Sequence, residues 1–336
     1  MQVTIIGAGV AGLTCAVEFA ERGVTVEVLE RGEEIGRQSC SWYAGGMLAP
    51  RCERERAEPL ISSLGAESVR WWLERFPGTT ASGSLVVAHG RDTAELRQFS
   101  HRTEGFEWLG CNGIGKLEPD LAGRFNSALF FSEEAHLDPR DTLQLLAHRL
   151  RELGGRICFA TCGAHGLPSK SPIIDCSGMG ARQVLGDLRG VKGEMLVLRS
   201  REVTLSRPVR VLHPRIPVYV VPRGDGAFMV GATMIESDDS RRITARSVHE
   251  LLSAAYSLHP AFGDAEILEI GTQVRPAFPD NLPKLRRIGD RLYVNGLYRH
   301  GFLLAPALAR RAAETVLNNQ WYPEVMDEDP RERRFA

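Results

Sequence analysis

The sequence predicts a mixed α/β fold (α+β overall) built from two parts. Near the start, the apolar run of residues 3–6 leads into Gly7-Ala8-Gly9-Val10-Ala11-Gly12 and then into a helical stretch, which is the order of a βα unit in a parallel sheet. Between residues 193 and 270, strand-like segments dominate, as they do in an antiparallel sheet. We therefore expect a Rossmann-like dinucleotide-binding domain joined to a second, mainly antiparallel-sheet domain.

The glycine spacing is the one that a dinucleotide pyrophosphate requires. Gly7 permits the tight turn out of the strand, Gly9 lets the backbone approach the pyrophosphate, and Gly12 lets the helix pack closely on the sheet. Glu30 follows the second strand-like run, about 20 residues on, and would accept hydrogen bonds from a ribose. The rival reading is a chance glycine-rich turn, which would not need this order of strand, helix and acidic residue.

Size and charge exclude several classes of protein. The 336 residues, 43% apolar and 25% charged, are enough for two domains with cores of their own. A net charge of −1 gives no general attraction to nucleic acid or to an anionic membrane. No apolar stretch approaches the length of a membrane span, and the first strand begins at residue 2, which leaves no room for a signal peptide. We expect a cytoplasmic protein with neither kind of partner.

The seven cysteines all lie between Cys15 and Cys176, without C-x-x-C spacing. This pattern argues against a disulfide framework, a zinc ribbon and a redox dithiol. We therefore expect no metal site.

The first elements follow from apolar patterning. Residues 11–22 are predicted as a crossover helix and residues 25–29 as a second parallel strand, because that run is continuously apolar. The next segment, residues 32–50, ends in Ala44-Gly45-Gly46-Met47-Leu48-Ala49-Pro50, too rich in glycine for a helix and too small-sided for a core strand. It is either a solvent loop or a loop that lies against a large planar ligand.

The remaining elements alternate between helical and strand-like texture. Helices are predicted at residues 54–76, 142–153 and 305–318. Strands are predicted at residues 84–88, 156–159, 173–176, 195–198, 218–221, 228–232 and 292–295, and the strand at 173–176 feeds a glycine turn and a helix. We assign residues 1–80, 136–190 and 272–336 to the dinucleotide-binding domain, and residues 81–135 and 191–271 to the substrate-binding domain. The charged tail 326–334 is expected to be disordered.

The chain has one glycine fingerprint and not two. Gly110-Cys111-Asn112-Gly113-Ile114-Gly115 is assigned to a loop, because no apolar strand runs into it. Enzymes that pass hydride from NADPH to a flavin usually need two such sites. A single site favours a nicotinamide dehydrogenase or a flavoprotein that its own substrate reduces.

Several separated motifs distinguish between these two classes of enzyme. They are the N-terminal fingerprint, Ala44-Gly45-Gly46-Met47-Leu48-Ala49-Pro50, Tyr219-Val220-Val221-Pro222-Arg223, Val230-Gly231-Ala232-Thr233-Met234, Val274-Arg275-Pro276 with Pro279-Asp280, and Gly296-Leu297-Tyr298-Arg299-His300-Gly301. The motifs occur in this order over nearly the whole length of the chain. In this the chain resembles the FAD-dependent amino acid oxidase family, most closely its glycine-oxidising members.

The resemblance implies a noncovalent FAD, because the chain has Tyr43 near the place where some relatives carry a tethering histidine, and no cysteine after Cys176. The first glycine-rich loop would reach the isoalloxazine ring, and the last glycine-rich turn would contact its pyrimidine end. The cofactor-binding residues implied are Gly7, Gly9, Ala11, Gly12, Glu30, Arg31, Ser39, Ser41, Gly45, Gly46, Met47, Gly178, Arg299, His300, Gly301 and Phe302.

The substrate-binding residues implied come from the later motifs. Arg275 offers two parallel N–H donors to a carboxylate, although an ordinary surface arginine is the alternative. Tyr219 would donate its phenol to the same carboxylate, or be a half-buried strand tyrosine. Arg299 would contact substrate or flavin carbonyls, or cap backbone. Met47 and Met234 resemble pocket-lining residues, or fill the core.

The sequence shows no pair of residues suited to acid–base catalysis, which is compatible with loss of a hydride from a neutral amine to flavin N5. His300 is interpreted as a structural or flavin-contacting residue and not as a base. The resemblance implies oxidation of glycine, sarcosine or small D-amino acids, with O₂ reduced to H₂O₂ and the imine of glycine feeding thiamine thiazole synthesis. We expect a homo-oligomer, dimer or tetramer. The alternatives are a D-amino acid or N-methyl amino acid oxidase or dehydrogenase of the same fold, and a noncatalytic flavin-binding protein.

Overall fold

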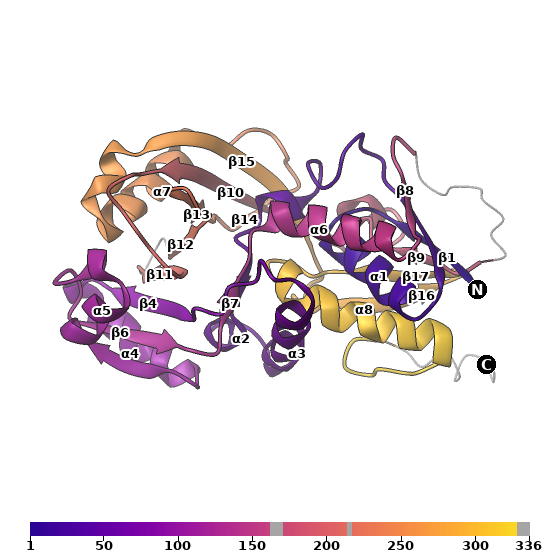
Figure 1. The fold of residues 1–336 in the computed structure, drawn as a ribbon, viewed down its shortest axis with the longest axis horizontal. Coiled ribbons are helices and arrows are strands. Elements are labelled where there is room, and N and C mark those ends of the chain that lie inside the picture. The colour runs from indigo at the N-terminus through magenta and orange to yellow at the C-terminus, as the bar shows by residue number, and fades with distance from the viewer. Residues whose placement is uncertain (162–170, 214–216, 328–336) are drawn as a thin grey trace.

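The computed structural model describes residues 1–161, 171–213 and 217–327, and it contains a six-stranded sheet and a nine-stranded sheet (Figure 1). The six-stranded sheet has the order β16-β17-β9-β1-β2-β8. Its strands are β1 (Gln2–Ile6), β2 (Thr25–Leu29), β8 (Arg156–Cys158), β9 (Ile173–Asp175), β16 (Lys284–Ile288) and β17 (Arg291–Asn295). Neighbouring strands are parallel except β16 and β17. This is the Rossmann-like arrangement that the sequence predicts.

Helices cover the face of this sheet to which Val3 and Ile5 point. Residues 3–6 of β1 are all buried, as a doubly covered parallel strand requires. Helix α1 packs against both α6 and α8, and α8 also packs against α3 (Figure 1). These helices are α1 (Val10–Glu21), α3 (Pro59–Arg75), α6 (Pro139–Glu152) and α8 (Gly301–Asn318).

The nine-stranded sheet has the order β14-β10-β13-β12-β11-β4-β6-β5, and β15 pairs with β10. Its strands are β4 (Ser84–Ala88), β5 (Glu107–Gly110), β6 (Ser127–Phe131), β10 (Arg189–Arg199), β11 (Val209–Leu212), β12 (Val218–Pro222), β13 (Ala227–Gly231), β14 (Ile235–Glu236) and β15 (Glu266–Ala277). Only the β11–β4 pair is parallel. The predicted antiparallel sheet is therefore confirmed.

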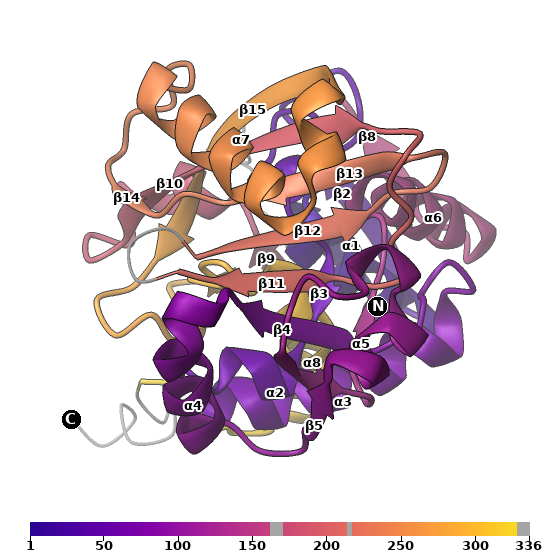
Figure 2. The same cartoon turned by 90° about the vertical axis from the view of Figure 1, so that its left-hand side faces the viewer.

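Helix α7 (Ala245–Leu258) covers one face of this sheet (Figure 2). Leu251 and Leu258 of the helix share a buried cluster with Val220 of β12 and Val211 of β11. Successive side chains of a strand point to opposite faces of the sheet. The neighbours of Val220 and Val211 along their strands therefore project from the other face. That second face carries the candidate site described below. Helix α4 (Thr93–Arg102) packs against β4 and β6.

Three predicted elements differ in the structure. The helix predicted at residues 54–76 is present as α3 but begins only at Pro59, because proline suits the first turn of a helix and not its interior; α2 (Pro50–Glu53) is a separate short helix. Residues 32–50 are not a plain loop, since they include a 3₁₀ turn, Cys40–Tyr43, and β3 (Met47–Leu48), which pairs with β7 (Ala135–His136). After β9 the chain forms a single 3₁₀ turn, Gly178–Ala181, and not a longer helix.

Residues 110–115, predicted as a loop, lie mainly in a helix. Strand β5 ends at Gly110 and α5 (Cys111–Leu117) follows at once. The strand escaped prediction because it is short and mostly exposed, and so lacks the apolar run of a covered strand. As the outermost strand of the large sheet, it does not place these glycines at the carboxyl edge of a parallel sheet, where dinucleotides bind.

The predicted disordered tail begins too early. Met326 is buried, and Asp327 pairs with Lys284 and Arg286, so these two residues are part of the fold. The rest of the predicted tail lies outside the described residues. Within the part of the chain that the structure describes, no helix combines the length and the apolar character needed to cross a membrane.

Candidate functional site

A cleft of about 2010 Å³, including space open to solvent, lies at the carboxyl ends of β1, β2 and β9. This is the edge of a parallel sheet where dinucleotides bind. The sequence-predicted residues that line it are Gly7, Gly9, Ala11, Glu30, Arg31, Ser39, Ser41, Gly178 and Gly301. The structure thus brings most of the predicted cofactor residues together at one place.

The glycine fingerprint has the geometry that its spacing predicts. Gly7 has a φ of +95°, which only glycine adopts readily. A Cβ on Gly12 would overlap the carbonyl oxygen of Gly7, so Gly12 allows the close packing of helix on strand and does not line the cleft. Gly9 is the N-cap of α1 and has no side chain over the helix end. The N–H of Val10 donates to Ser41 Oγ at 3.1 Å, and the positive end of α1 otherwise faces the cleft, where it favours an anion.

Glu30 is buried and held by two backbone amides. Its Oε2 accepts a hydrogen bond from the N–H of Ala8 at 2.7 Å, and its Oε1 accepts one from the N–H of Gly32 at 2.8 Å. Each carboxylate oxygen can accept a further bond. The carboxylate is thus fixed at the edge of the cleft with capacity left for ribose hydroxyls. Together with the open end of α1, this donor and acceptor set fits the ribose and pyrophosphate of FAD.

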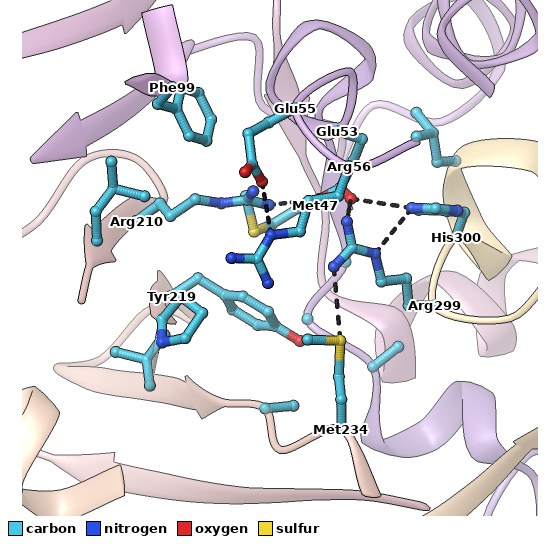
Figure 3. A pocket seen from close by; sticks show the side chains of 18 of the residues that line it. Met47, Glu53, Glu55, Arg56, Phe99, Arg210, Tyr219, Met234, Arg299 and His300 are labelled. Atoms are coloured by element: carbon cyan, nitrogen blue, oxygen red, sulfur yellow. Dashed lines mark hydrogen bonds and ion pairs between the residues drawn. The ribbon is translucent and has the colours of Figure 1, made fainter. Parts of the chain in front are cut away.

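A second cavity, of about 1100 Å³ including open solvent, lies between the large sheet and the start of α8 (Figure 3). Gly301 lines both this cavity and the cleft, so the two adjoin. The sequence-predicted residues that line the second cavity are Gly45, Gly46, Met47, Tyr219, Met234, Arg275, Arg299, His300 and Phe302. Residues predicted for the flavin end and for the substrate are therefore brought together next to the dinucleotide cleft.

The large sheet supplies three polar side chains to this cavity through strand alternation. Arg210 lies between two valines of β11 that face α7, and Tyr219 lies between two such valines of β12. Both side chains therefore project from the opposite face. Arg275 reaches the same cavity from β15. Tyr219 is half-buried and lies against Gly45.

Arg275 is a cation of the cavity that has no carboxylate partner among the described residues. Its Nη1 donates to the carbonyl oxygen of Thr233 at 3.1 Å, and no ion pair joins it to any acidic group among the described residues. It is half-buried. The guanidinium thus has N–H donors left for an anionic ligand.

Arg223 fixes the glycine-rich loop at the cavity wall. Its Nη2 donates to the carbonyls of Ala44 at 2.8 Å and Gly45 at 3.1 Å, and its Nη1 donates to that of Leu137 at 3.0 Å. Gly46 has a φ of +72°. The loop therefore has a defined shape and presents Met47 to the cavity.

Glu53 joins two arginines and a histidine in the cavity, as the dashed lines in Figure 3 show. Its Oε2 accepts from Arg299 and lies 2.9 Å from His300 Nε2, while its Oε1 accepts from Arg210. Burial alone would raise the pKa of Glu53, but the charges of Arg299 and Arg210 outweigh it, and the pKa is held well below its usual range. Glu53 is therefore a carboxylate at neutral pH and a poor proton acceptor.

His300 is buried, at 5% exposure, and burial lowers its pKa more than the neighbouring Glu53 raises it. Its Nδ1 has no hydrogen-bond partner among the residues that the structure describes. A buried polar atom of this kind is normally satisfied, and His300 faces the cavity where a bound group could serve it. Arg299 donates to side chains, those of Glu53 and His300, and its Nη1 lies 3.7 Å from Met234 Sδ.

The sequence interpretation missed Glu53 and Arg210. Glu53 lies in Arg51-Cys52-Glu53-Arg54-Glu55-Arg56, a run whose charges are typical of an exposed helix. Arg210 gave one usable signal, because its place between two valines in a strand puts it on the face opposite to them. Neither residue could be joined to Arg299 without the tertiary structure.

Comparison with known proteins agrees with this geometry. Residues 2–315 match the family described as FAD dependent oxidoreductase (DAO). The chain is 53% identical over 325 residues to a Rhizobium etli protein described as a thiamine biosynthesis oxidoreductase, ThiO, covering 96% of this chain and 99% of that protein. It is 27% identical over 366 residues to the glycine oxidase of Bacillus licheniformis, covering 99% and 97%.

Two further comparisons concern a fusion protein and the fold. The bifunctional protein ThiO/ThiG of Synechocystis is 26% identical over 356 residues, which cover 96% of this chain and 53% of that protein. The crystal structure of glycine oxidase from Bacillus cereus superposes with a TM-score of 0.80 at 22% identity, over 95% of this chain and 96% of that chain, which confirms the fold. By its sequence match from residue 2 to residue 315, with the cleft and cavity in place, this chain belongs to the DAO family of FAD-dependent oxidoreductases.

Proposed function

We propose that this protein oxidises glycine and other small amines or amino acids, such as sarcosine and small D-amino acids, and passes the electrons to O₂ to form H₂O₂. The observation that carries the proposal is Arg275, a half-buried guanidinium with free donors in a cavity that adjoins the cleft at Gly301. The relatives described as glycine oxidase and ThiO support the choice of a small amino acid.

FAD, when bound, supplies a two-electron acceptor. Gly9 and the start of α1 would hold the pyrophosphate, and Glu30 would hold a ribose, because these groups line the cleft. The loop around Gly45 and Gly46, together with residues 299–302, would hold the flavin end, because they line the adjoining cavity. The buried Nδ1 of His300 offers that end a hydrogen-bonding atom. The segments 1–80, 136–190 and 272–336 would form the FAD-binding unit.

Arg275 and Tyr219 would fix the substrate carboxylate. Two parallel N–H groups of a guanidinium match the two carboxylate oxygens, and the phenol of Tyr219 would add a third donor from the neighbouring part of the sheet. Contacts at one end orient a small molecule as a whole, so that its Cα–H and amine keep one direction. Met47 and Met234 line the same cavity and would exclude water from the amine end.

The amine must enter in its neutral form, because Glu53 is held as a carboxylate by two arginines and is a poor base. The substrate then gives up its Cα–H as a hydride, with both electrons of the bond, and becomes a protonated imine. Water would hydrolyse a free imine to ammonia and an oxo acid. The relatives described by a role in thiamine biosynthesis, and the fused ThiO/ThiG protein, support delivery of the glycine imine to thiazole synthesis.

Glycine should be oxidised with a higher kcat/KM than D-phenylalanine, and H₂O₂ should appear in step with O₂ consumption. The relatives described as glycine oxidase support this preference. Flavin bleaching without oxygen, measured with glycine, sarcosine and a set of D-amino acids, would rank the substrates. A clear preference for D-phenylalanine would contradict the proposal. Bleaching without O₂ consumption would indicate a dehydrogenase, and no bleaching with any amine would indicate a noncatalytic protein.

The FAD should be noncovalent, so that acid precipitation releases the yellow colour into solution. Cys40 lines the cleft, but burial raises the pKa of its thiol, which disfavours the thiolate needed for attachment. Tyr43 stands where a tethering histidine would be needed. Flavin that stays in the protein pellet would contradict this prediction, and release from a Cys40→Ser variant would then locate the tether.

A further inference from the structure

Gly193 lies directly beneath the guanidinium of Arg275. An added Cβ on Gly193 would overlap Arg275 Nη2 and Cζ and would lie 2.9 Å from its Nε. Arg275 is paired with Val191 across the β10–β15 ladder, and Gly193 is paired with Gln273. Side chains of residues two apart on a strand share a face, so the Arg275 side chain crosses β10 diagonally from Val191 and ends on Gly193.

Tyr219 lies against a glycine in the same way. A Cβ on Gly45 would lie 2.7 Å from Tyr219 Cε2 and 3.4 Å from its hydroxyl oxygen. Gly45 is held in place by the hydrogen bond from Arg223 to its carbonyl. Both side chains that we assign to the substrate carboxylate thus occupy space that exists only because a glycine lacks a side chain.

We propose that Gly193 and Gly45 are positioning residues. Because they lack side chains, Arg275 and Tyr219 can lie against the backbone, and this fixes how deep in the cavity the substrate carboxylate binds. The inference rests on the proposed role of Arg275 as carboxylate anchor. Neither glycine would touch the substrate. Each would act through the side chain that lies on it.

The backbone at Gly193 cannot move away from an added methyl group. Strand β10 pairs with β15 on one side, and with β14 and β13 on the other at the flanking residues. Gly193 does not have a positive φ, so alanine fits its backbone conformation. The long side chain of Arg275 would therefore shift instead, away from the carbonyl of Thr233 and into the cavity.

The test uses the FAD-loaded enzyme and acetate, a carboxylate without an amine, titrated by the change that it causes in the flavin absorption band. Gly193→Ala should weaken acetate binding and lower kcat/KM for glycine on the order of tenfold to a hundredfold, the scale of a misplaced anchoring group. FAD content should stay at the wild-type level. Gly186→Ala is the matched control, because an added Cβ there meets nothing within 4 Å, and it should match wild type in both assays.

A double-mutant cycle with Arg275→Ala separates positioning from a general structural effect. If Gly193 acts through Arg275, Gly193→Ala should change acetate affinity by no more than about twofold once Arg275 is alanine. An equal loss in both backgrounds, or wild-type affinity in Gly193→Ala, would overturn the inference. Wild-type affinity in Arg275→Ala alone would overturn the anchor itself, and the positioning role with it.

Thermal unfolding keeps the inference testable if Gly193→Ala folds poorly. Removing the guanidinium removes the overlapping atoms, so the Gly193→Ala/Arg275→Ala protein should then have a higher Tm than Gly193→Ala. A double variant as unstable as the single one would show that the methyl group conflicts with something other than Arg275. Gly45→Ala should likewise weaken acetate binding, and should lose that effect in a Tyr219→Ala background.

Discussion

Arg275→Ala should lower kcat/KM for glycine by at least about 30-fold. Removing one partner of a buried, hydrogen-bonded charge pair costs roughly 2 to 5 kcal/mol, which at about 1.4 kcal/mol per tenfold corresponds to about 30-fold to several thousand-fold. The arginine is half-buried and has no ion pair among the described residues, so its donors are available to the substrate. FAD content should not change, because Arg275 does not line the cleft that would hold the pyrophosphate and ribose.

Arg275→Lys should recover only part of that loss, because a single ammonium cannot hold both carboxylate oxygens and orient the Cα–H. Steady-state kinetics and flavin absorbance measure the two quantities separately. Arg241→Ala is a suitable control, since the Arg241 side chain is 89% exposed and its ion-pair partner among the described residues is Asp239. An Arg275→Ala enzyme within about fivefold of wild type, at the scale of a surface arginine, would move the anchor elsewhere, with Arg299 next to test.

Gly9→Val should give a folded protein that contains no FAD. An added Cβ on Gly9 lies 3.3 Å from Ser41 Oγ, which is tight but not blocked, so the fold should survive. The two methyl groups of valine would then stand at the open end of α1, where a pyrophosphate must approach the backbone. Absorbance near the flavin band after purification, with circular dichroism to check the fold, measures the outcome.

Gly78→Val provides the control for Gly9→Val, because an added Cβ at Gly78 meets nothing within 4 Å and the residue lines neither cavity. This variant should keep its FAD. A Gly9→Val protein that purifies with a full complement of FAD would show that the pyrophosphate does not approach the backbone at this glycine.

The sequence was informative where function depends on the backbone. Gly7, Gly9 and Gly12 follow one strand and open one helix, so their roles follow from local conformation alone, and the structure places them as predicted. Glu30 was predictable because a fixed spacing separates it from the glycines. The hydrogen bonds that Glu30 accepts from the amides of Ala8 and Gly32 could not be predicted, because they depend on how the two strands are placed.

The sequence was least informative where charges from distant segments meet. Glu53 and Arg299 are bonded across 246 positions of the chain, and no local pattern relates them. Pro59 shows a different limit, because α3 begins at this residue although the helical pattern was read from residue 54. Gly193 was predicted only as the start of a region of strand-like segments, because the position of Arg275 over it depends on how β10 and β15 pair.

The contacts of helix α8 determine when the parts of this protein can come together during synthesis. The helix packs against α1 and α3, and its first residue, Gly301, belongs to both cavities. A ribosome releases the glycine fingerprint long before α8, so in the interval α1 lacks one of the helices that pack on it in the folded protein. Contacts between such distant segments form late in folding. The residues that line both cavities are therefore brought together only after α8 has been synthesised.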